Sequence, residues 1–124
     1  MIYTSYFGKL KKLPHNYEPI CIAKWPPKWF KGKQFSQLAP SKELLNWWNG
    51  SDKDKDCEIT YELQFRKQTL SKLDPIEIEK AIHNLAGDKI PVLVCYEKSY
   101  DFCHRHLVRN WLNKNGIKCE EFNE

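Results

Sequence analysis

The sequence predicts an α/β protein with a mostly parallel sheet and helices on both faces. Two short and nearly unbroken apolar runs, at 19–23 and 90–95, are typical of parallel strands that are buried on both sides. Segments with helical spacing of apolar residues alternate with the strands, and this alternation indicates crossover connections between parallel strands. With 124 residues, 41% of them hydrophobic and 29% charged, residues 1–124 are expected to form about one globular domain.

Two further strands and one long loop complete the expected sheet. Aromatic and β-branched residues at 3–7 precede a glycine and predict a first strand, and 117–122 is expected to return as an edge strand. Residues 10–16 should connect the first two strands. The segment 24–40 carries three prolines and a glycine, so we expect a long ordered loop in place of a regular helix.

Helix starts and stops are marked by capping residues. Ser41 is a good N-cap for a helix that reaches Trp48 and ends at Asn49-Gly50. Asp74 should cap a later helix, with Pro75 at its first position and Gly87 at its end. The clearest helix is expected at 101–115. The helix expected at 57–70 has two neighbouring apolar stripes. The first stripe contains Ile59, Leu63, Arg66 and Leu70, and the second contains Tyr61 and Phe65.

Charge and cysteine content restrict the partners and the compartment. Lys and Arg outnumber Asp and Glu by 20 to 16, a mild excess that favours an anionic ligand without requiring nucleic acid. We expect no membrane association, because no apolar run approaches the roughly 18 residues of a membrane span. The N-terminus lacks the pattern of a signal peptide, which favours a cytoplasmic location. Five cysteines, an odd number without regular spacing, favour reduced thiols.

Reactive side chains gather where the strand at 90–95 leads into the last helix. Cys95 and Glu97 are two residues apart, so along an extended strand they should point to the same side. Cys103, His104 and Arg105 are expected in the first turn of the helix, where unpaired N–H groups stabilise a thiolate or a bound phosphate. Because ligands bind outside the carboxyl ends of the strands of open α/β sheets, this turn is the candidate site.

The pattern is compatible with nucleophilic catalysis. Cys103 is a candidate nucleophile, His104 or His106 a candidate base, and Arg105 a candidate holder of an oxyanion. Each residue also has a structural interpretation. His104 would point into the core and donate a hydrogen bond to a strand carbonyl, Cys95 would be an inert buried thiol, and Arg105 would pair with Glu97.

We predict neither a metal nor a cofactor. The cluster contains ligand types that suit zinc, but it has no C-x-x-C pair. Cys103 and His104 would also project about 100° apart on a helix, so both could hardly bind one ion. A Walker loop, a G-x-G-x-x-G loop and a G-x-S-x-G elbow are absent, which excludes standard nucleotide hydrolysis, dinucleotide binding and serine hydrolysis.

Residues 24–35 carry a second functional pattern. Aromatic residues such as Trp25 and Trp29 alternate with lysines, and this mixture suits stacking on bases combined with neutralisation of phosphates. In the structural interpretation the aromatic residues cover the edge of the core while the lysines stay solvated.

The run V-L-V-C-Y-E-K-S-Y-D-F-C-H-R-H-L-V, at 92–108, resembles the signature of the family called domain of unknown function 488. Members of that family end in an apolar strand, a C-x-E and a C-H-R helix start. A strand Ile2-Tyr3-Thr4-Ser5, a proline-bearing loop at Trp25 and a tyrosine in a middle helix, Tyr61, also fit, so the resemblance covers most of the chain.

This resemblance implies a small Rossmann-like, three-layer α/β domain to which no biochemical activity is attached. It supports the motif residues as the site and adds Tyr3, Ser5 and Tyr61 as ligand contacts. One departure concerns the end of the second strand, where many members have Asp-x-Arg and this chain has Ile22-Ala23-Lys24. Lys24 keeps the positive charge but not the bidentate fork, and a mechanism that needs the aspartate is not expected.

From the sequence we therefore predict a domain that binds an anionic small molecule, such as a nucleotide derivative, at the carboxyl ends of the strands. Arg105 and Lys24 would hold the anion, Trp25 would contact the ligand, and Cys103 or Cys95 would be the reactive group. The alternative is a non-catalytic module that binds single-stranded nucleic acid through the loop 24–35. The sequence predicts no oligomeric state.

Overall fold

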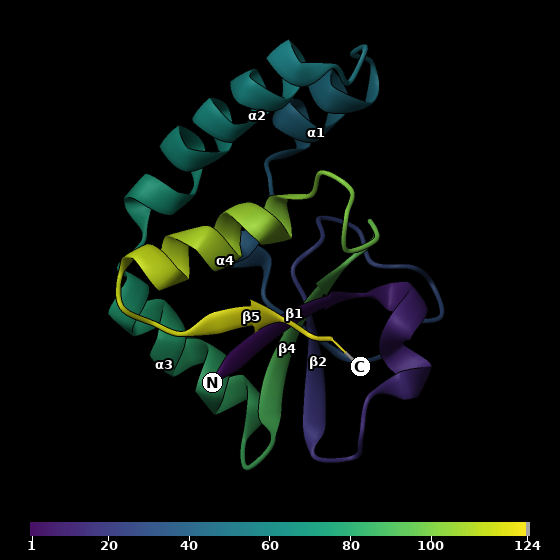
Figure 1. Ribbon diagram of the computed structural model, residues 1–124, viewed down its shortest axis with the longest axis vertical. Helices are drawn as coiled ribbons and strands as arrows, with labels where there is room; N and C mark the ends of the chain where they lie inside the picture. Colours follow the sequence, from purple (N-terminus) through teal and green to yellow (C-terminus); the bar gives the residue numbers. More distant parts are fainter. Residues whose placement is uncertain (124) are drawn as a thin grey trace.

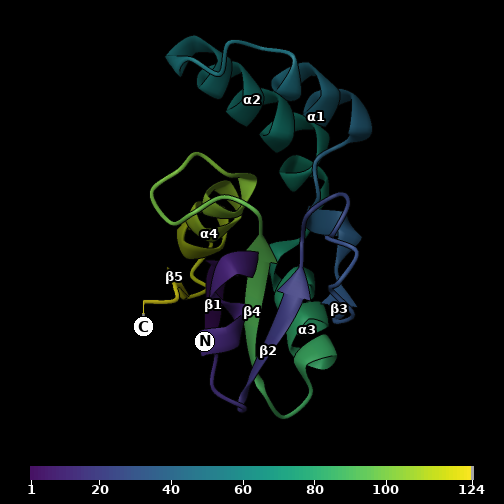
Figure 2. The ribbon, with the colours of Figure 1, turned by 90° about the vertical axis from the view of Figure 1, so that its right-hand side faces the viewer.

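The computed structural model describes residues 1–123, and within them the chain forms a five-stranded sheet in the order β3-β2-β4-β1-β5 (Figures 1 and 2). Every neighbouring pair of strands is parallel, so the predicted α/β class and parallel sheet are confirmed. The strands are β1 (Ile2–Tyr6), β2 (Tyr17–Cys21), β3 (Lys33–Gln34), β4 (Ile90–Cys95) and β5 (Cys119–Glu121).

The strands β1, β2 and β4 end at the same level of the sheet. Tyr6 is the register partner of Cys95, and Cys21 is the partner of Val94. The central position of β4 explains its unbroken apolar sequence, because Val92, Leu93 and Val94 are all fully buried between the two faces. Side chains that follow the ends of β2 and β4 are therefore brought to one edge of the sheet.

Four α-helices lie within the described residues, and the N-caps predicted for two of them are confirmed. The Ser41 hydroxyl accepts the backbone N–H of Leu44 at 3.1 Å, and the Asp74 carboxylate accepts that of Ile76 at 3.0 Å. Gly87 ends a helix with φ of +66°, a conformation that favours glycine. The helices are α1 (Lys42–Asn49), α2 (Lys55–Gln68), α3 (Pro75–Ala86) and α4 (His104–Lys114).

The two faces of the sheet are covered differently. Helices α3 and α4 pack on one face and share a core cluster with Leu93 of β4 (Figure 1). The other face is covered by the 3-10 helix η1 (Phe7–Lys12) and by Phe30 from the loop after β2. The expectation of helices on both faces is thus only partly met, because the second layer consists of this short 3-10 helix and of aromatic side chains. Among these, Phe7 and Phe30 pack edge to face at 5.3 Å.

Helices α1 and α2 form a hairpin that stands above the carboxyl ends of β2 and β4 (Figures 1 and 2). Of the two apolar stripes on α2, the structure buries the one with Tyr61 and Phe65. Ile59 and Leu63 of the other stripe are 53% and 62% exposed. Tyr61 and Phe65 are selected because large aromatic rings bury the most apolar area against their neighbours.

Several element boundaries differ from the expected ones. The loop 24–40 contains the two-residue strand β3, which pairs with the end of β2, and the 3-10 helix η2 (Ser36–Leu38). Helix α2 begins at Lys55, capped by Asp54, and the last helix begins at His104 instead of Asp101. A further 3-10 helix, η3 (Leu70–Lys72), separates α2 from α3. In the part of the chain that the structure describes, no helix has the length and apolar character needed to cross a bilayer.

Candidate functional site

A pocket of about 300 Å³ lies at the carboxyl ends of β2 and β4, beneath the α1–α2 hairpin. Its walls are largely aromatic, and its floor is made by sulfur and imidazole groups from the end of β4 and the start of α4. Lys24 and Glu97 supply one charge of each sign at the pocket. The aromatic wall residues are Trp25, Trp48, Tyr61, Tyr96 and Phe102.

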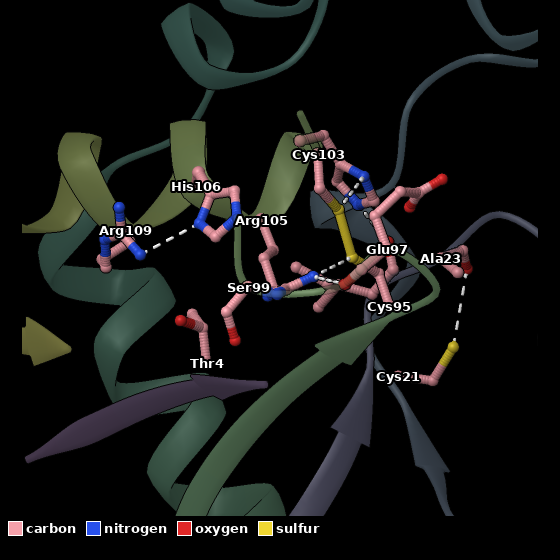
Figure 3. The surroundings of a disulfide bond; sticks show 12 residues. Thr4, Cys21, Ala23, Cys95, Glu97, Ser99, Cys103, Arg105, His106 and Arg109 are labelled. Carbon is pink, nitrogen blue, oxygen red and sulfur yellow. Dashed lines mark hydrogen bonds between the residues drawn. A yellow bond between two sulfur atoms is a disulfide. The ribbon is translucent and has the colours of Figure 1, made fainter. Parts of the chain in front are cut away.

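The floor contains two bonded cysteines. Cys95 ends β4, Cys103 is the N-cap of α4, and their sulfur atoms form a disulfide (Figure 3). The expectation of reduced thiols is therefore wrong for this pair in the structure, whereas Cys21, Cys57 and Cys119 are free. The expected place of Cys103 in the first helical turn is also wrong. Its backbone is extended, and this conformation lets its side chain reach the end of β4.

Arg105 lies beneath the sulfur pair and is fully buried. Its Nη1 atom donates a hydrogen bond to the Cys95 sulfur at 3.1 Å and another to the Glu97 backbone carbonyl at 2.7 Å (Figure 3). A guanidinium at this distance stabilises negative charge on sulfur, so the reduced form of Cys95 is favoured as a thiolate. The predicted alternative, a pairing of the Arg105 and Glu97 charges, is wrong, because Arg105 contacts only the backbone carbonyl of Glu97 and makes its ion pair with Glu121.

The charge of Arg105 is balanced by Glu121 of β5. The guanidinium donates from Nε to one Glu121 carboxylate oxygen at 3.1 Å and from Nη2 to the other at 2.7 Å. Thr4 and Ser99 donate hydroxyl hydrogen bonds to the same carboxylate. Burial opposes ionisation of Glu121, but these hydrogen bonds and the Arg105 charge outweigh it and hold its pKa below the usual value. Glu121 therefore neutralises the buried charge of Arg105 and holds the guanidinium in place under Cys95.

His104 faces both the core and the pocket. Its Nε2 lies 2.7 Å from the backbone carbonyl of Ile22, and because a carbonyl can only accept, Nε2 carries the proton. The predicted hydrogen bond to a carbonyl at a strand end is thus confirmed. The unprotonated Nδ1 faces the Cys103 sulfur at 3.9 Å. Burial lowers the pKa of His104 to about 4, so the ring is neutral near pH 7.

These three side chains form a group with the composition of a metal site. The ligand atoms of Cys95, Cys103 and His104 all lie within 4.8 Å of one another. The sequence argument against a shared ion assumed that Cys103 and His104 are both helical. Because Cys103 precedes the helix in an extended conformation, the two adjacent side chains converge instead of projecting apart.

A protein-family model matches the chain. The model described as "Active DUF488-N3 subclade" matches residues 8–116, which is most of the chain. The chain belongs to the DUF488 family. The resemblance seen at 92–108 is confirmed, and it extends far beyond that motif. No curated protein and no solved structure matches the chain.

In this member of the DUF488 family, the predicted ligand contacts fall into two groups. Lys24, Trp25 and Tyr61 line the pocket together with the motif residue Glu97. Burial and, to a smaller extent, the Glu97 charge raise the pKa of Tyr61, so its hydroxyl stays protonated at neutral pH. Cys95 and Glu97 both line the pocket, but so does Tyr96 between them, because β4 ends at Cys95 and the strand alternation does not continue to Glu97.

The other predicted contacts lie outside the pocket. Tyr3 packs against Tyr17 and Phe122 on the η1 side of the sheet, with ring centroids 5.7 and 5.9 Å away. The Ser5 hydroxyl is buried and has no hydrogen-bond partner among the described residues. Arg105 does not line the pocket. Its buried guanidinium contacts Cys95 and Glu121 instead. A direct contact between Arg105 and a ligand does not fit this placement.

Sequence reasoning missed two groups of residues. Trp48, Tyr96 and Phe102 were assigned to elements or to the motif but not to the pocket wall. Their aromatic character was the available signal, since apolar walls are usual in ligand sites. Thr4 and Glu121 gave no local signal. Glu121 lies 16 residues beyond Arg105 on a separate strand, and only the pairing of β5 with β1 brings it there.

Proposed function

We propose that this protein binds a small molecule with a flat ring and an anionic group, such as a nucleotide derivative, and that the sulfur pair on the pocket floor is the reactive element. The observation that carries this proposal is the convergence of Cys95, Cys103 and His104 on one aromatic-walled pocket. The description of the matched family model calls the subclade active and names no reaction.

The walls favour a flat, partly apolar ligand. Trp48 and Phe102 lie 4.9 Å apart between ring centroids, and Tyr61 contacts Phe102 edge to face at 5.3 Å. Aromatic side chains stack on heterocycles with about 1–3 kcal/mol per base. The volume, about 300 Å³, lies at the small end of ligand pockets and suits a single ring system with a short substituent.

The polar groups of the pocket give the ligand an orientation. Lys24 is the cation that lines the pocket, so a phosphate or carboxylate would lie at its side. Glu97 and the Tyr61 hydroxyl lie elsewhere on the wall and would bind hydroxyl or ring N–H groups. The anion would then be at the rim and the reacting part of the molecule over the floor.

The floor is equipped for thiol chemistry once the disulfide is reduced. Arg105 stabilises a thiolate at Cys95 through the hydrogen bond from Nη1. At Cys103, the unprotonated Nδ1 of His104 faces the sulfur at 3.9 Å and would accept a hydrogen bond from the thiol. Burial in an apolar pocket excludes water from both sulfurs and strengthens these interactions.

Ligand binding is tested by tryptophan fluorescence during titration with nucleoside monophosphates, in the oxidised and the reduced protein. We expect Lys24→Ala to weaken binding by about 10-fold, because a charge-assisted hydrogen bond contributes about 1.5–3 kcal/mol. Trp25→Phe should weaken it less. The matched controls are Lys28→Ala and Trp29→Phe, which change exposed residues of the same loop outside the pocket.

Equal effects of the pocket variants and the control variants would contradict the proposal. The absence of any saturable change with nucleotides, nucleosides and aromatic carboxylates would also contradict it. If a bound ligand leaves the alkylation rates of Cys95 and Cys103 unchanged, the sulfur pair is not the reactive element. Only the ligand-binding part of the proposal would then remain.

The second candidate function is binding of single-stranded nucleic acid by the loop 24–35. One observation favours it: Trp29 is 61% exposed and is flanked by the exposed Lys28 and Lys31. Binding should fall steeply with salt and be lost in Trp29→Ala. However, Trp25 lines the pocket while Trp29 packs on Phe7, so the two rings belong to different clusters. Affinity for an oligonucleotide that survives Trp29→Ala would contradict this candidate.

A further inference from the structure

We propose that, in the reduced protein, Cys95, Cys103 and His104 bind one zinc ion whose fourth coordination position opens into the pocket. The ligand types and their number match those of catalytic zinc sites, in which three protein ligands leave one position for water or substrate. Thiolate and imidazole ligands in a tetrahedral arrangement select zinc over the hard cations, which prefer oxygen. The proposal builds on the pocket of the function proposed above but replaces its thiol chemistry with chemistry at the ion, because both sulfurs and the His104 Nδ1 become zinc ligands.

The ligand atoms lie close to the positions that one ion requires, once reduction lets the two bonded sulfurs separate. With Zn–S of about 2.3 Å and Zn–N of about 2.0 Å, a tetrahedral site places neighbouring ligand atoms about 3.5–3.8 Å apart. The Cys103 sulfur and the His104 Nδ1 are already 3.9 Å apart. All three ligand atoms lie within 4.8 Å of one another, so an ion between them requires only small side-chain movements.

The backbone around the two cysteines is wide enough for an ion. Their Cα atoms lie 7.8 Å apart. Disulfides are usually found where this distance is below about 7 Å. On reduction the two sulfurs can separate to the spacing of a zinc site without any approach of β4 and α4.

The surroundings orient the three ligands, as hydrogen-bonding groups behind the ligands do in metal sites. The Nε2–H of His104 donates to the Ile22 carbonyl, which leaves Nδ1 unprotonated and aimed at the cluster. The packing of the His104 ring against Phe65, at 5.5 Å between centroids, holds its plane. Arg105 donates to the Cys95 sulfur, and this bond stabilises a thiolate ligand.

The charges of the site also balance. Two thiolates neutralise Zn²⁺, and the His104 ring is neutral when only Nε2 carries a proton. The positive charge of Arg105 is separately neutralised by the bidentate contact with Glu121. An ion is therefore accommodated without leaving a buried uncompensated charge.

The open position determines what such an ion could do. Cys95, Cys103 and His104 all line the pocket, so the remaining coordination position faces the same space as Lys24 and Glu97. Zinc in such a site polarises a substrate oxygen or lowers the pKa of a bound water to about 7. This part of the inference rests on the proposed function, whereas the binding of the ion does not.

The first experiment counts zinc in the reduced protein. Wild-type protein is reduced, loaded with Zn²⁺, passed over a desalting column and analysed for metal by mass spectrometry. We expect one zinc per chain in the wild type and in Cys57→Ser, which changes a free cysteine of α2. Cys103→Ser and His104→Asn should lower the zinc affinity at least about 100-fold and leave little zinc after desalting, because even the loss of a group that only orients a ligand lowers metal affinity 10–100-fold.

A second measurement needs no variant, so it is independent of whether a variant folds. Titration of the reduced wild-type protein with Co²⁺ should give the thiolate charge-transfer band and the intense visible bands of a tetrahedral site, and Zn²⁺ should abolish both. Zinc should also protect Cys95 and Cys103 from alkylation. Oxidised protein, with the sulfurs bonded, should bind neither ion.

Three results would overturn the inference. The first is reduced, folded wild-type protein that holds no zinc and gives no cobalt spectrum. The second is a folded Cys103→Ser variant that keeps its zinc, and the third is oxidised protein that binds as tightly as reduced protein. Failure of the proposed function has a different signature, because loss of nucleotide binding in every titration would leave the zinc count and the cobalt spectrum unchanged.

Discussion

Two pairs of buried cysteines in this protein have opposite surroundings. Cys95 and Cys103 contact Arg105 and His104 and line the pocket. Cys21 and Cys119 are equally buried at the ends of other strands but lie outside the pocket wall. Burial raises the pKa of Cys21, and it raises the pKa of Cys119 to about 12. Burial alone therefore makes a thiol inert, and the neighbouring cation and base distinguish the candidate functional pair.

The largest predicted effect is the loss of stability when Arg105, the cation beside Cys95, is removed. Arg105→Ala leaves the partly buried Glu121 carboxylate with only the longer ion pair to Arg109, at 3.8 Å, and such a change costs about 3 kcal/mol of unfolding free energy. Urea denaturation of the variant measures this loss, and Arg105→Lys should retain part of the stability and of the charge near Cys95.

The matched control is Arg66→Ala. Arg66 makes a 2.9 Å ion pair with Glu62 on α2, but both side chains are more than a third exposed. Its loss should cost about 0.5 kcal/mol or less. Similar losses in the Arg66 and Arg105 variants would show that the buried pair does not support the Cys95 site.

Acid should weaken the fold through His104, the neighbour of Cys103. Its pKa is about 4 in the folded chain against 6.5 for an unperturbed histidine, so the unfolded chain binds more protons between these values. Stability is complete above pH 6.5 and falls as the pH decreases, by about 3 kcal/mol by pH 4. Urea unfolding at several pH values, with a chelator present, measures the slope.

The variants His104→Asn and His15→Asn separate this contribution from general acid effects. His15 is exposed, so its replacement should leave the slope unchanged. Replacement of His104 should reduce it. Burial also lowers the pKa of His106 to about 4. This ring contributes a second slope of the same sign, so the His104 variant should lose only part of the pH dependence of stability. A pH-independent stability between 7 and 4.5 would mean that both rings are solvated.

Alkylation compares the two cysteine pairs directly. In reduced, metal-free protein at pH 7.5, we expect Cys95 and Cys103 to react at least about 100-fold faster than Cys119, because the thiolate is the reactive form. Peptide-resolved mass spectrometry after short exposure to iodoacetamide gives the four rates. If all four cysteines react only as fast as the protein unfolds, the neighbours of the Cys95–Cys103 pair have no effect on reactivity.

The smallest effect is expected for Cys119→Ala. This change removes one buried sulfur and should cost about 1 kcal/mol of stability, similar to the loss of a buried methylene group. Nucleotide affinity and zinc content should equal those of the wild type. A loss of either one would show that Cys119 belongs to the site and would abolish the contrast between the two pairs.

Local signals in the sequence were sufficient for the strands and the helix caps. The apolar run of β4 and the cap residues Ser41 and Asp74 act through neighbours that are close in sequence, so their effects can be predicted without tertiary structure. The choice between the two stripes of α2 could not be predicted, because it depends on Trp48 and Phe102. Burial of the larger rings determined the outcome.

The candidate site was predicted in composition but not in arrangement. The motif at 92–108 indicates the thiols, the imidazole and the guanidinium, and the structure brings all of them together. The role of Arg105 could not be deduced, because its partner Glu121 is supplied by another strand. The disulfide depended on the extended conformation of Cys103, which a continuous helical pattern conceals.

The position of Glu121 has a consequence for how the protein is made. Every group on the pocket floor lies at or before Arg105 in the chain, whereas the carboxylate that neutralises Arg105 is added by the ribosome 16 residues later. Until β5 pairs with β1, the guanidinium has no counterion and cannot be buried at low cost. The reactive pair is thus completed only after β5 has been added, and a nascent chain that has not reached β5 has no finished site to expose.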